Sequence, residues 1–162
     1  MPRLLALLLC LASVGLVSCA SSTVATKKGT RISSVRTTAY THTESDHIVY
    51  GKATAIGSDL KFGRVRSAAA DWSVYPVGTI FQIEGTPYIY QVDDYGSALV
   101  GTNTIDLYKP SKTEMNQWGV RNVNIRVLRW GSFSKSLSIL KPRSHWEHVD
   151  KMAGRIEKQK RL

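Results

Sequence analysis

The chain has 162 residues and a formal net charge of +10, from 22 Lys and Arg against 12 Asp and Glu. Residues 36–131 carry ten basic and nine acidic residues, whereas residues 132–162 carry eight basic and three acidic. A nucleic-acid-binding face needs Lys and Arg clustered on the folded domain, so this distribution argues against a nucleic-acid partner. The basic ends fit contact with anionic lipid or an anionic wall polymer, or are simply solvated charges.

The N-terminal segment has the pattern of a secretory signal. A short basic start precedes an apolar run that is too short to span a membrane comfortably, and we predict a signal peptide at residues 1–18. LVSC before and at Cys19 resembles the bacterial lipobox, so we expect a lipid on Cys19, although a plain secretory signal is the alternative. Because Ala20, and not an aspartate, follows Cys19, we expect the lipid anchor to hold the protein at the outer membrane, facing the periplasm. With Cys10 removed and Cys19 lipidated, the mature chain has no disulfide.

Residues 19–34 are small, polar and mildly basic, so we predict a lipidated flexible tether there. The folded domain is expected at residues 35–131. Its alternating polar and apolar residues predict short strands separated by Gly and Pro, and such closely spaced strands favour a small β-barrel. The expected strands are VRTTAYTH from Val35, RSAAAD from Arg66, TIFQIEG from Thr79, PYIYQVDD from Pro87, TIDLY from Thr104 and VNIRVLRW from Val123.

Two helices are predicted among and after these strands. In SKTEMNQWG, Ser111 and Glu114 have the spacing of a capping box, and Gly119 is placed to end the helix. In the basic C-terminal extension, residues 132–162, apolar residues at steps of three and four predict an amphipathic helix. We expect this apolar stripe to pack on the barrel, with partner binding as the alternative. The stripe consists of Trp146, Val149, Met152 and Ile156.

QVDDYGSALVGTNTIDLY gathers Asp93, Asp94 and Asp106 in a chain that is poor in acidic residues. A period of two turns Ile105 and Leu107 into the barrel and Asp106 to its outer face. We predict that the segment after Asp94 forms a hairpin that brings Asp94 to about 5 Å from Asp106. Two carboxylates that close cannot both ionise cheaply, so one pKa should rise, as a general acid requires. Alternatively, Asp93 or Asp94 only caps the turn.

Several motifs resemble those of the three-aspartate (3D) domain, which is found in membrane-bound lytic transglycosylase A and in small cell-wall proteins. They are AAADWSVYPVGT, DDYGSALVG and NTIDLY, with TTAY upstream and QWGVRNVNIRVL downstream. The resemblance covers roughly residues 36–130 and places the three aspartates at Asp71, Asp94 and Asp106. It implies a six-stranded double-psi β-barrel. With the two helices predicted above, we expect a mainly β fold with one short inserted helix and a C-terminal amphipathic helix.

The resemblance implies a lytic transglycosylase that cleaves the MurNAc–GlcNAc β-1,4 bond of peptidoglycan glycan strands and leaves 1,6-anhydro-MurNAc. Because the sugar's own 6-hydroxyl attacks, one acid/base group can suffice, whereas hydrolysis uses a pair of carboxylates. Asp106 is the predicted general acid and base. Asp94 and Asp71 are expected to raise its pKa, stabilise positive charge on the sugar and orient hydroxyls. The resemblance implies no cofactor, and we expect a monomer.

The chain departs from the family pattern near two of the aspartates, which puts sugar specificity in question more than the fold. The departures are Trp72 for Pro, Val77 for Leu, Tyr95 for Thr and Ser97 for Gly. We expect Tyr40, Thr54 and Tyr95 to line a substrate-binding groove, with simple packing as the alternative for each.

The sequence also contains features of two functions other than catalysis, glycan binding and metal binding. A non-catalytic glycan-binding lipoprotein would keep the same barrel but tolerate loss of Asp106. Two clusters, His42 with Glu44, Asp46 and His47, and His145 with His148, contain metal-ligating residue types. Neither cluster has the spacing of a known motif, so we predict no metal site.

Overall fold

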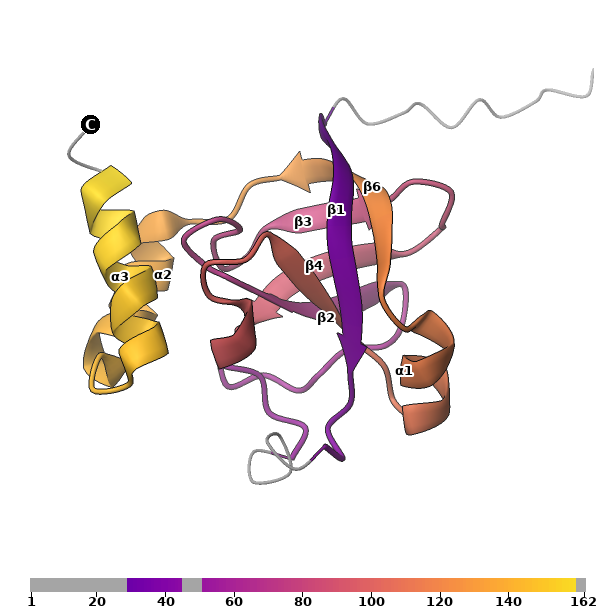
Figure 1. Cartoon of the computed structure of the whole chain (residues 1–162), viewed down its shortest axis with the longest axis horizontal. Helices are drawn as coiled ribbons and strands as arrows, with labels where there is room; N and C mark the ends of the chain where they lie inside the picture. The colour runs from indigo at the N-terminus through magenta and orange to yellow at the C-terminus, as the bar shows by residue number, and fades with distance from the viewer. Residues whose placement is uncertain (1–28, 45–50, 160–162) are drawn as a thin grey trace, which may run out of the picture.

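The computed structural model describes residues 29–44 and 51–159 (Figure 1). The predicted signal peptide and Cys19 lie outside these ranges, as do residues 19–28 of the predicted tether. Asp46 and His47 of the first His and acidic cluster also lie outside. Within the described ranges no group of three His, Cys, Asp or Glu side chains is arranged to hold a metal ion.

Six strands close into a barrel in the order β1-β5-β2-β4-β3-β6. The pairs β1–β5 and β2–β4 are parallel, and the other four pairs are antiparallel. The prediction of a mainly β, six-stranded barrel is confirmed. The strands are β1 (Thr30–Tyr40), β2 (Val65–Ala70), β3 (Ile80–Ile83), β4 (Ile89–Asp94), β5 (Thr104–Tyr108) and β6 (Arg121–Arg129).

The first strand begins earlier than its sequence pattern indicates. Thr30 pairs with Val127 and Ile32 with Ile125, so residues 30–34, which we assigned to the tether, belong to β1. The register with β6 shifts between Ile32 and Val35. This irregularity interrupts the alternation of polar and apolar residues by which a strand is recognised.

The barrel interior is filled by one face of each strand. Ile105 and Leu107 are fully buried in the core, as predicted, and Asp106 between them belongs to the outer face. Ala68 and Ala70 of β2 also point into the core. Because Ala69 lies between them, it faces outward beneath the side chains that form the candidate site.

The inserted helix α1 (Lys112–Trp118) forms as predicted. The hydroxyl of Ser111 accepts a hydrogen bond from the backbone N–H of Glu114 at 3.2 Å. Gly119 ends the helix with a φ of 59°, a conformation that glycine adopts without strain. Figure 1 shows α1 beside the end of β1, on the side of the barrel away from the C terminus.

The C-terminal extension packs on the opposite side of the barrel as a helical hairpin (Figure 1). It comprises α2 (Phe133–Leu140), the short 3-10 helix η2 (Lys141–Arg143) and α3 (Glu147–Gln159). Val149, Met152 and Ile156 are fully buried in the barrel core cluster, which confirms the packing of the predicted stripe. Trp146, by contrast, precedes α3 and is 56% exposed. No helix within the described ranges is long and apolar enough to span a membrane.

Candidate functional site

Asp94 and Asp106 lie on one outer row of the barrel. Asp106 pairs with Ala69 of β2, and Ala69 pairs in turn with Asp94 of β4. On its other side, Asp106 pairs with Thr38 of β1. Since partners in register point to the same face of a sheet, all four side chains face outward.

The predicted hairpin between Asp94 and Asp106 is wrong. Strand β2 lies between β4 and β5, so the segment after Asp94, which includes the 3-10 helix η1 (Ser97–Leu99), crosses to a non-adjacent strand. Two strand spacings separate the Cα atoms by roughly 10 Å, instead of the expected single spacing. Direct like-charge contact between these two carboxylates is therefore not what shifts a pKa here.

Tyr40 of β1 contacts Asp94, which lies on the far strand of the row. Its hydroxyl lies 3.4 Å from Oδ2 of Asp94, although Tyr40 is on β1 and Asp94 on β4. Its ring packs in one buried cluster with Ala69 of β2 and Tyr108 of β5, the two strands that lie between β1 and β4. Burial raises the pKa of Tyr40 well above its ordinary value, and the charges of Asp94, Asp93 and Asp106 raise it further. Tyr40 therefore stays protonated and can donate to a carboxylate.

Asp94 has the raised pKa that a general acid needs. Its side chain is almost completely buried, and this burial raises its pKa from 3.8 to about 6. Hydrogen bonds from the backbone N–H groups of Tyr95, at 2.9 Å, and Ala55, at 3.1 Å, act in the opposite direction. Desolvation is thus the dominant cause, where we had expected repulsion by Asp106.

Asp106 is the accessible carboxylate of the row. Its side chain is half-buried, whereas Asp93 and Asp94 are buried. The hydroxyl of Thr38 donates a short hydrogen bond of 2.6 Å to Oδ1 of Asp106. This contact holds the carboxylate in a defined orientation on the outer face, as the period of two predicted.

Asp93 joins the same face because of a bulge in β4. The register between β2 and β4 shifts at Ala68 and Ala69, so a strict alternation of faces does not hold there. Asp93 accepts a hydrogen bond from Ser67 and forms an ion pair with Lys61, each at 2.9 Å. Burial raises its pKa, although Lys61 and Ser67 oppose this effect. These contacts are with side chains of other segments, so Asp93 does not act as the turn cap we considered.

Asp71 makes its contacts away from this row. Its Oδ1 accepts from the backbone N–H and hydroxyl of Ser73, at 2.8 and 2.6 Å. Its Oδ2 accepts from the N–H of Gly101 at 2.8 Å and from Arg155 of α3 at 3.0 Å. Asp71 is fully buried, so this carboxylate ties together the loop after β2, the loop before β5 and the C-terminal extension.

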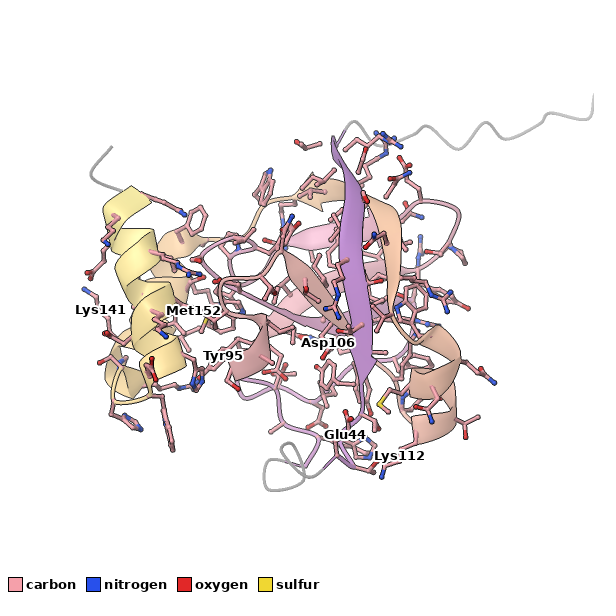
Figure 2. The ribbon with its side chains drawn as sticks, viewed as in Figure 1. Glu44, Tyr95, Asp106, Lys112, Lys141 and Met152 are labelled. Carbon is pink, nitrogen blue, oxygen red and sulfur yellow. The ribbon has the colours of Figure 1, made fainter. Side chains whose placement is uncertain are left out.

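Thr54 and Tyr95 lie close to Asp94 but make contacts of a structural kind. Thr54 is buried and donates to the carbonyl of Ser58, which fixes the turn whose Ala55 N–H reaches Asp94. Tyr95 packs edge-on against Trp72 with ring centroids 5.0 Å apart. Figure 2 shows Tyr95 on the side of the barrel that faces α3, whereas Asp106 lies beside β1.

Arg143 links the C-terminal extension to the residues around Asp94. Its Nη1 donates to the carbonyl of Ala55 at 2.9 Å and to the hydroxyl of Tyr95 at 3.3 Å. Ala55 and Tyr95 are the two residues whose N–H groups bind Asp94. The extension therefore braces both backbone donors of Asp94, a role that no motif in the sequence indicates.

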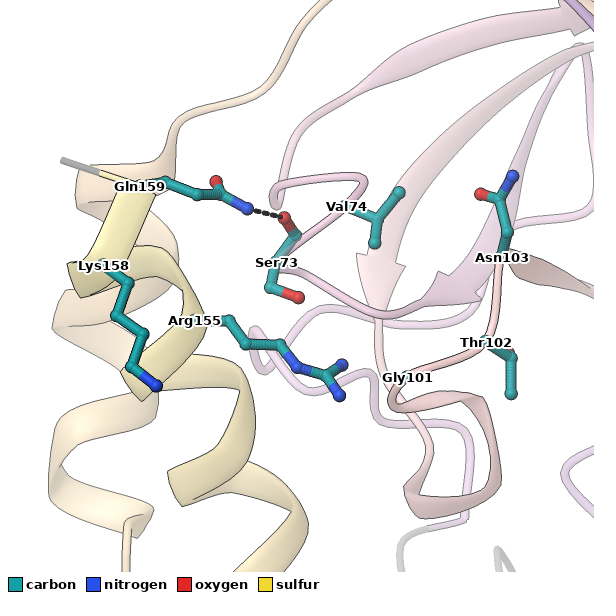
Figure 3. Close-up of a pocket in the computed structure, with 8 residues that line it drawn as sticks. All are labelled: Ser73, Val74, Gly101, Thr102, Asn103, Arg155, Lys158 and Gln159. Atoms are coloured by element: carbon teal, nitrogen blue, oxygen red, sulfur yellow. Dashed lines mark hydrogen bonds between the residues drawn. The ribbon is translucent and has the colours of Figure 1, made fainter. Parts of the chain in front are cut away.

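A cavity of about 510 Å³ lies beside Asp71, between α3 and the loops that Asp71 joins (Figure 3). Arg155 and Lys158 of α3 line one wall, and Gly101 and Thr102 line the other. Gln159 donates to the carbonyl of Ser73 at 3.0 Å across its edge. Neither Asp94 nor Asp106 lines this cavity.

Residues 66–129 match the family model of the 3D domain. The matched range includes Asp71, Asp94 and Asp106, and it extends from the start of β2 to the end of β6. It covers less than half of the chain and ends before the C-terminal extension.

Two Bacillus subtilis (strain 168) proteins are similar to the chain. The cell wall-binding protein YocH is 37% identical over 92 residues, which are 56% of this chain and 31% of YocH. YabE, whose name proposes a role in cell wall shaping, is 34% identical over 99 residues, which are 60% of this chain and 23% of YabE. The chain thus spans less than a third of the length of either relative.

Proposed function

We propose that this chain, which is a 3D-domain protein as its motifs predicted, is a peptidoglycan lytic transglycosylase of the cell envelope. The names of the two relatives support a role at the cell wall. The single observation that favours catalysis is the outer row, on which an accessible carboxylate, Asp106, is accompanied by a buried carboxyl of raised pKa, Asp94.

In the proposed reaction, Asp106 protonates the glycosidic oxygen that leaves as the 4-hydroxyl of GlcNAc. The C1–O bond of MurNAc breaks, and positive charge develops on C1 and the ring oxygen. The carboxylate of Asp106 then accepts the proton of the 6-hydroxyl of the same MurNAc as O6 bonds to C1. One group thus acts as acid and then base, and no water is consumed.

Asp94 and Tyr40 would influence the charge state of Asp106 from positions beneath the bound substrate. Asp94 is too deeply buried to reach a glycosidic oxygen, but its charge state changes the field at Tyr40 and along the row. Asp71 holds the loop that leads into β5 and so positions Asp106 indirectly. The three residues expected to bind sugar, Tyr40, Thr54 and Tyr95, all make contacts that support Asp94 or its neighbours, and of the three Tyr95 is the most exposed.

The second candidate is a non-catalytic wall binder, which the name of YocH favours. Co-sedimentation with purified peptidoglycan, together with release of soluble fragments, separates the two functions. An enzyme binds the wall and releases fragments, and Asp106→Asn abolishes release without abolishing binding. Asp59→Asn is the matched control, because Asp59 is an exposed loop aspartate. Binding without release by the parent protein would favour the binder.

We further propose that Cys19 carries lipid and holds the protein at the outer membrane, on the lipobox-like sequence before it. Metabolic labelling with a radioactive fatty acid tests this anchor. Label should appear in the parent protein and be lost in Cys19→Ser, and equal labelling of both would reject it.

A further inference from the structure

Lys109 has a largely buried side chain, and its ammonium group has no ionic partner among the described residues. It follows β5 directly and is only 6% exposed. Within residues 29–44 and 51–159 its Nζ makes no hydrogen bond or ion pair, and it lies 4.7 Å from the ring centroid of Trp118 and 5.8 Å from that of Phe62. Aromatic faces attract a cation, and the ammonium group itself is not among the fully buried polar atoms of the described residues. It therefore keeps contact with solvent, where an acidic group can replace water as the acceptor.

Lys109 lines a cavity of about 190 Å³ beside α1 and the start of β6. Trp118, Arg121, Gln117 and Glu114 complete the lining. At about 30 Å³ of liquid volume for each water molecule, the cavity holds about six waters. A small acidic group fits this space.

The charges around the cavity are mainly positive. Arg121 stacks on Trp118 at 4.3 Å, and its Nε and Nη2 donate to the backbone carbonyls at the end of α1. Glu114 is the acidic group in the lining, and its Oε2 accepts from Ser111. The pKa of Lys109 is lowered first by burial and then by Arg66, and Glu114 offsets this only in part. An anion in the cavity would relieve both effects.

The cavity is close to the outer row. Lys109 is three residues beyond Asp106, so their Cα atoms are about 10 Å apart along an extended chain. The backbone N–H of Lys109 donates to the carbonyl of Tyr40 at 2.8 Å, which fixes the two segments relative to each other. To reach Lys109, a substituent of a glycan strand seated on Asp106 would have to span about 10 Å.

We propose that the cavity lined by Lys109, Trp118 and Arg121, here called the Lys109 pocket, binds a carboxylate of the wall polymer while the glycan lies on Asp106. This subsite rests on the proposed peptidoglycan function. The carboxylate is the lactyl group of an unsubstituted MurNAc or an acidic group of a stem peptide. Lys109 forms a charge-assisted hydrogen bond with it, and Trp118 packs against its apolar part.

The test compares three probes on an Asp106→Asn background that does not cleave them. Peptide-free glycan strands carry the lactyl carboxylate, peptide-bearing strands carry stem carboxylates, and chitin oligosaccharides carry neither. Lys109→Met keeps most of the apolar stem, and Lys112→Met removes an exposed lysine of α1 as the matched control. Affinities are measured by titration calorimetry, and thermal unfolding shows whether each variant remains folded.

A hydrogen bond to a charged group corresponds to about tenfold or more in affinity. We therefore expect Lys109→Met to weaken binding of one or both carboxylate-bearing strands about tenfold, to leave chitin binding unchanged, and to be partly rescued in Lys109→Arg. The strand that loses affinity identifies the source of the carboxylate. If Lys109→Met instead only lowers the unfolding temperature and binds all probes like Lys112→Met, Lys109 is a structural brace and the subsite is rejected.

Failure of the subsite and failure of the proposed function give different results. If strands bind to the Asp106→Asn protein and Lys109→Met does not change the preference for carboxylate, only the subsite fails. If no strand binds to the Asp106→Asn protein, although it is folded, both fail.

Discussion

Replacement of Asp94 by Asn should make the protein more stable, and the gain should depend on pH. In the folded protein, burial raises the pKa of Asp94 from 3.8 to about 6. A carboxyl with a raised pKa binds more protons in the folded state than in the unfolded state between these two values, so stability falls as pH rises through this range. At about 1.4 kcal/mol for each pH unit, the loss is about 3 kcal/mol.

Asp94→Asn does not ionise and so avoids this loss. The Asn carbonyl can still accept from the N–H groups of Tyr95 and Ala55. Below about pH 4 the two proteins should differ little. Above pH 6 the variant should be more stable by up to about 3 kcal/mol, less any loss of charge-assisted hydrogen bonding.

Urea unfolding at a series of pH values measures this difference directly. Asp59→Asn removes an exposed carboxylate and is the matched control for the substitution itself. A difference for Asp94→Asn that is flat with pH, or that grows toward low pH, would refute the conclusion that burial dominates at Asp94.

Two further predictions concern the residues that support the site, and a third concerns the cap of α1. Ala69→Leu should push the Tyr40 ring away from Asp94. We expect the free energy of unfolding, measured with urea, to fall by about 1–3 kcal/mol, and the release of wall fragments to fall as well. Unchanged release would show that activity does not depend on the position of Tyr40. Arg155→Met removes the ionic partner of the fully buried Asp71. Because Arg155 is half exposed and its charge is screened by solvent, thermal unfolding should show a fall of only about 1–3 kcal/mol in the free energy of unfolding. Ser111→Ala should cost about 1 kcal/mol by removing the α1 cap, with fragment release unaffected.

Local features of the fold could be predicted from the sequence because they depend on neighbouring residues. The period of two placed Ile105 and Leu107 inside and Asp106 outside, and Ser111 and Gly119 marked the ends of α1. The apolar stripe of α3 likewise predicted its buried face. In each case the signal and the structure lie within a few residues of each other.

Features that depend on distant pairing could not be predicted in the same way. Nothing in the segment between Asp94 and Asp106 indicates that β2 lies between their strands, since that order results from pairing along all of β2. The bulge that turns Asp93 to the outer face arises in the same pairing. The contacts of Asp71 and Ala55 with Arg155 and Arg143 join segments more than 80 residues apart.

The most direct test of the proposed catalysis is the mass of the muropeptides that the purified protein releases from peptidoglycan. We predict products that end in 1,6-anhydro-MurNAc, lighter by one water than the reducing form, and none from Asp106→Asn. Reducing-end products would contradict attack by the sugar's own 6-hydroxyl. Absence of products from a parent protein that still binds the wall would contradict catalysis itself.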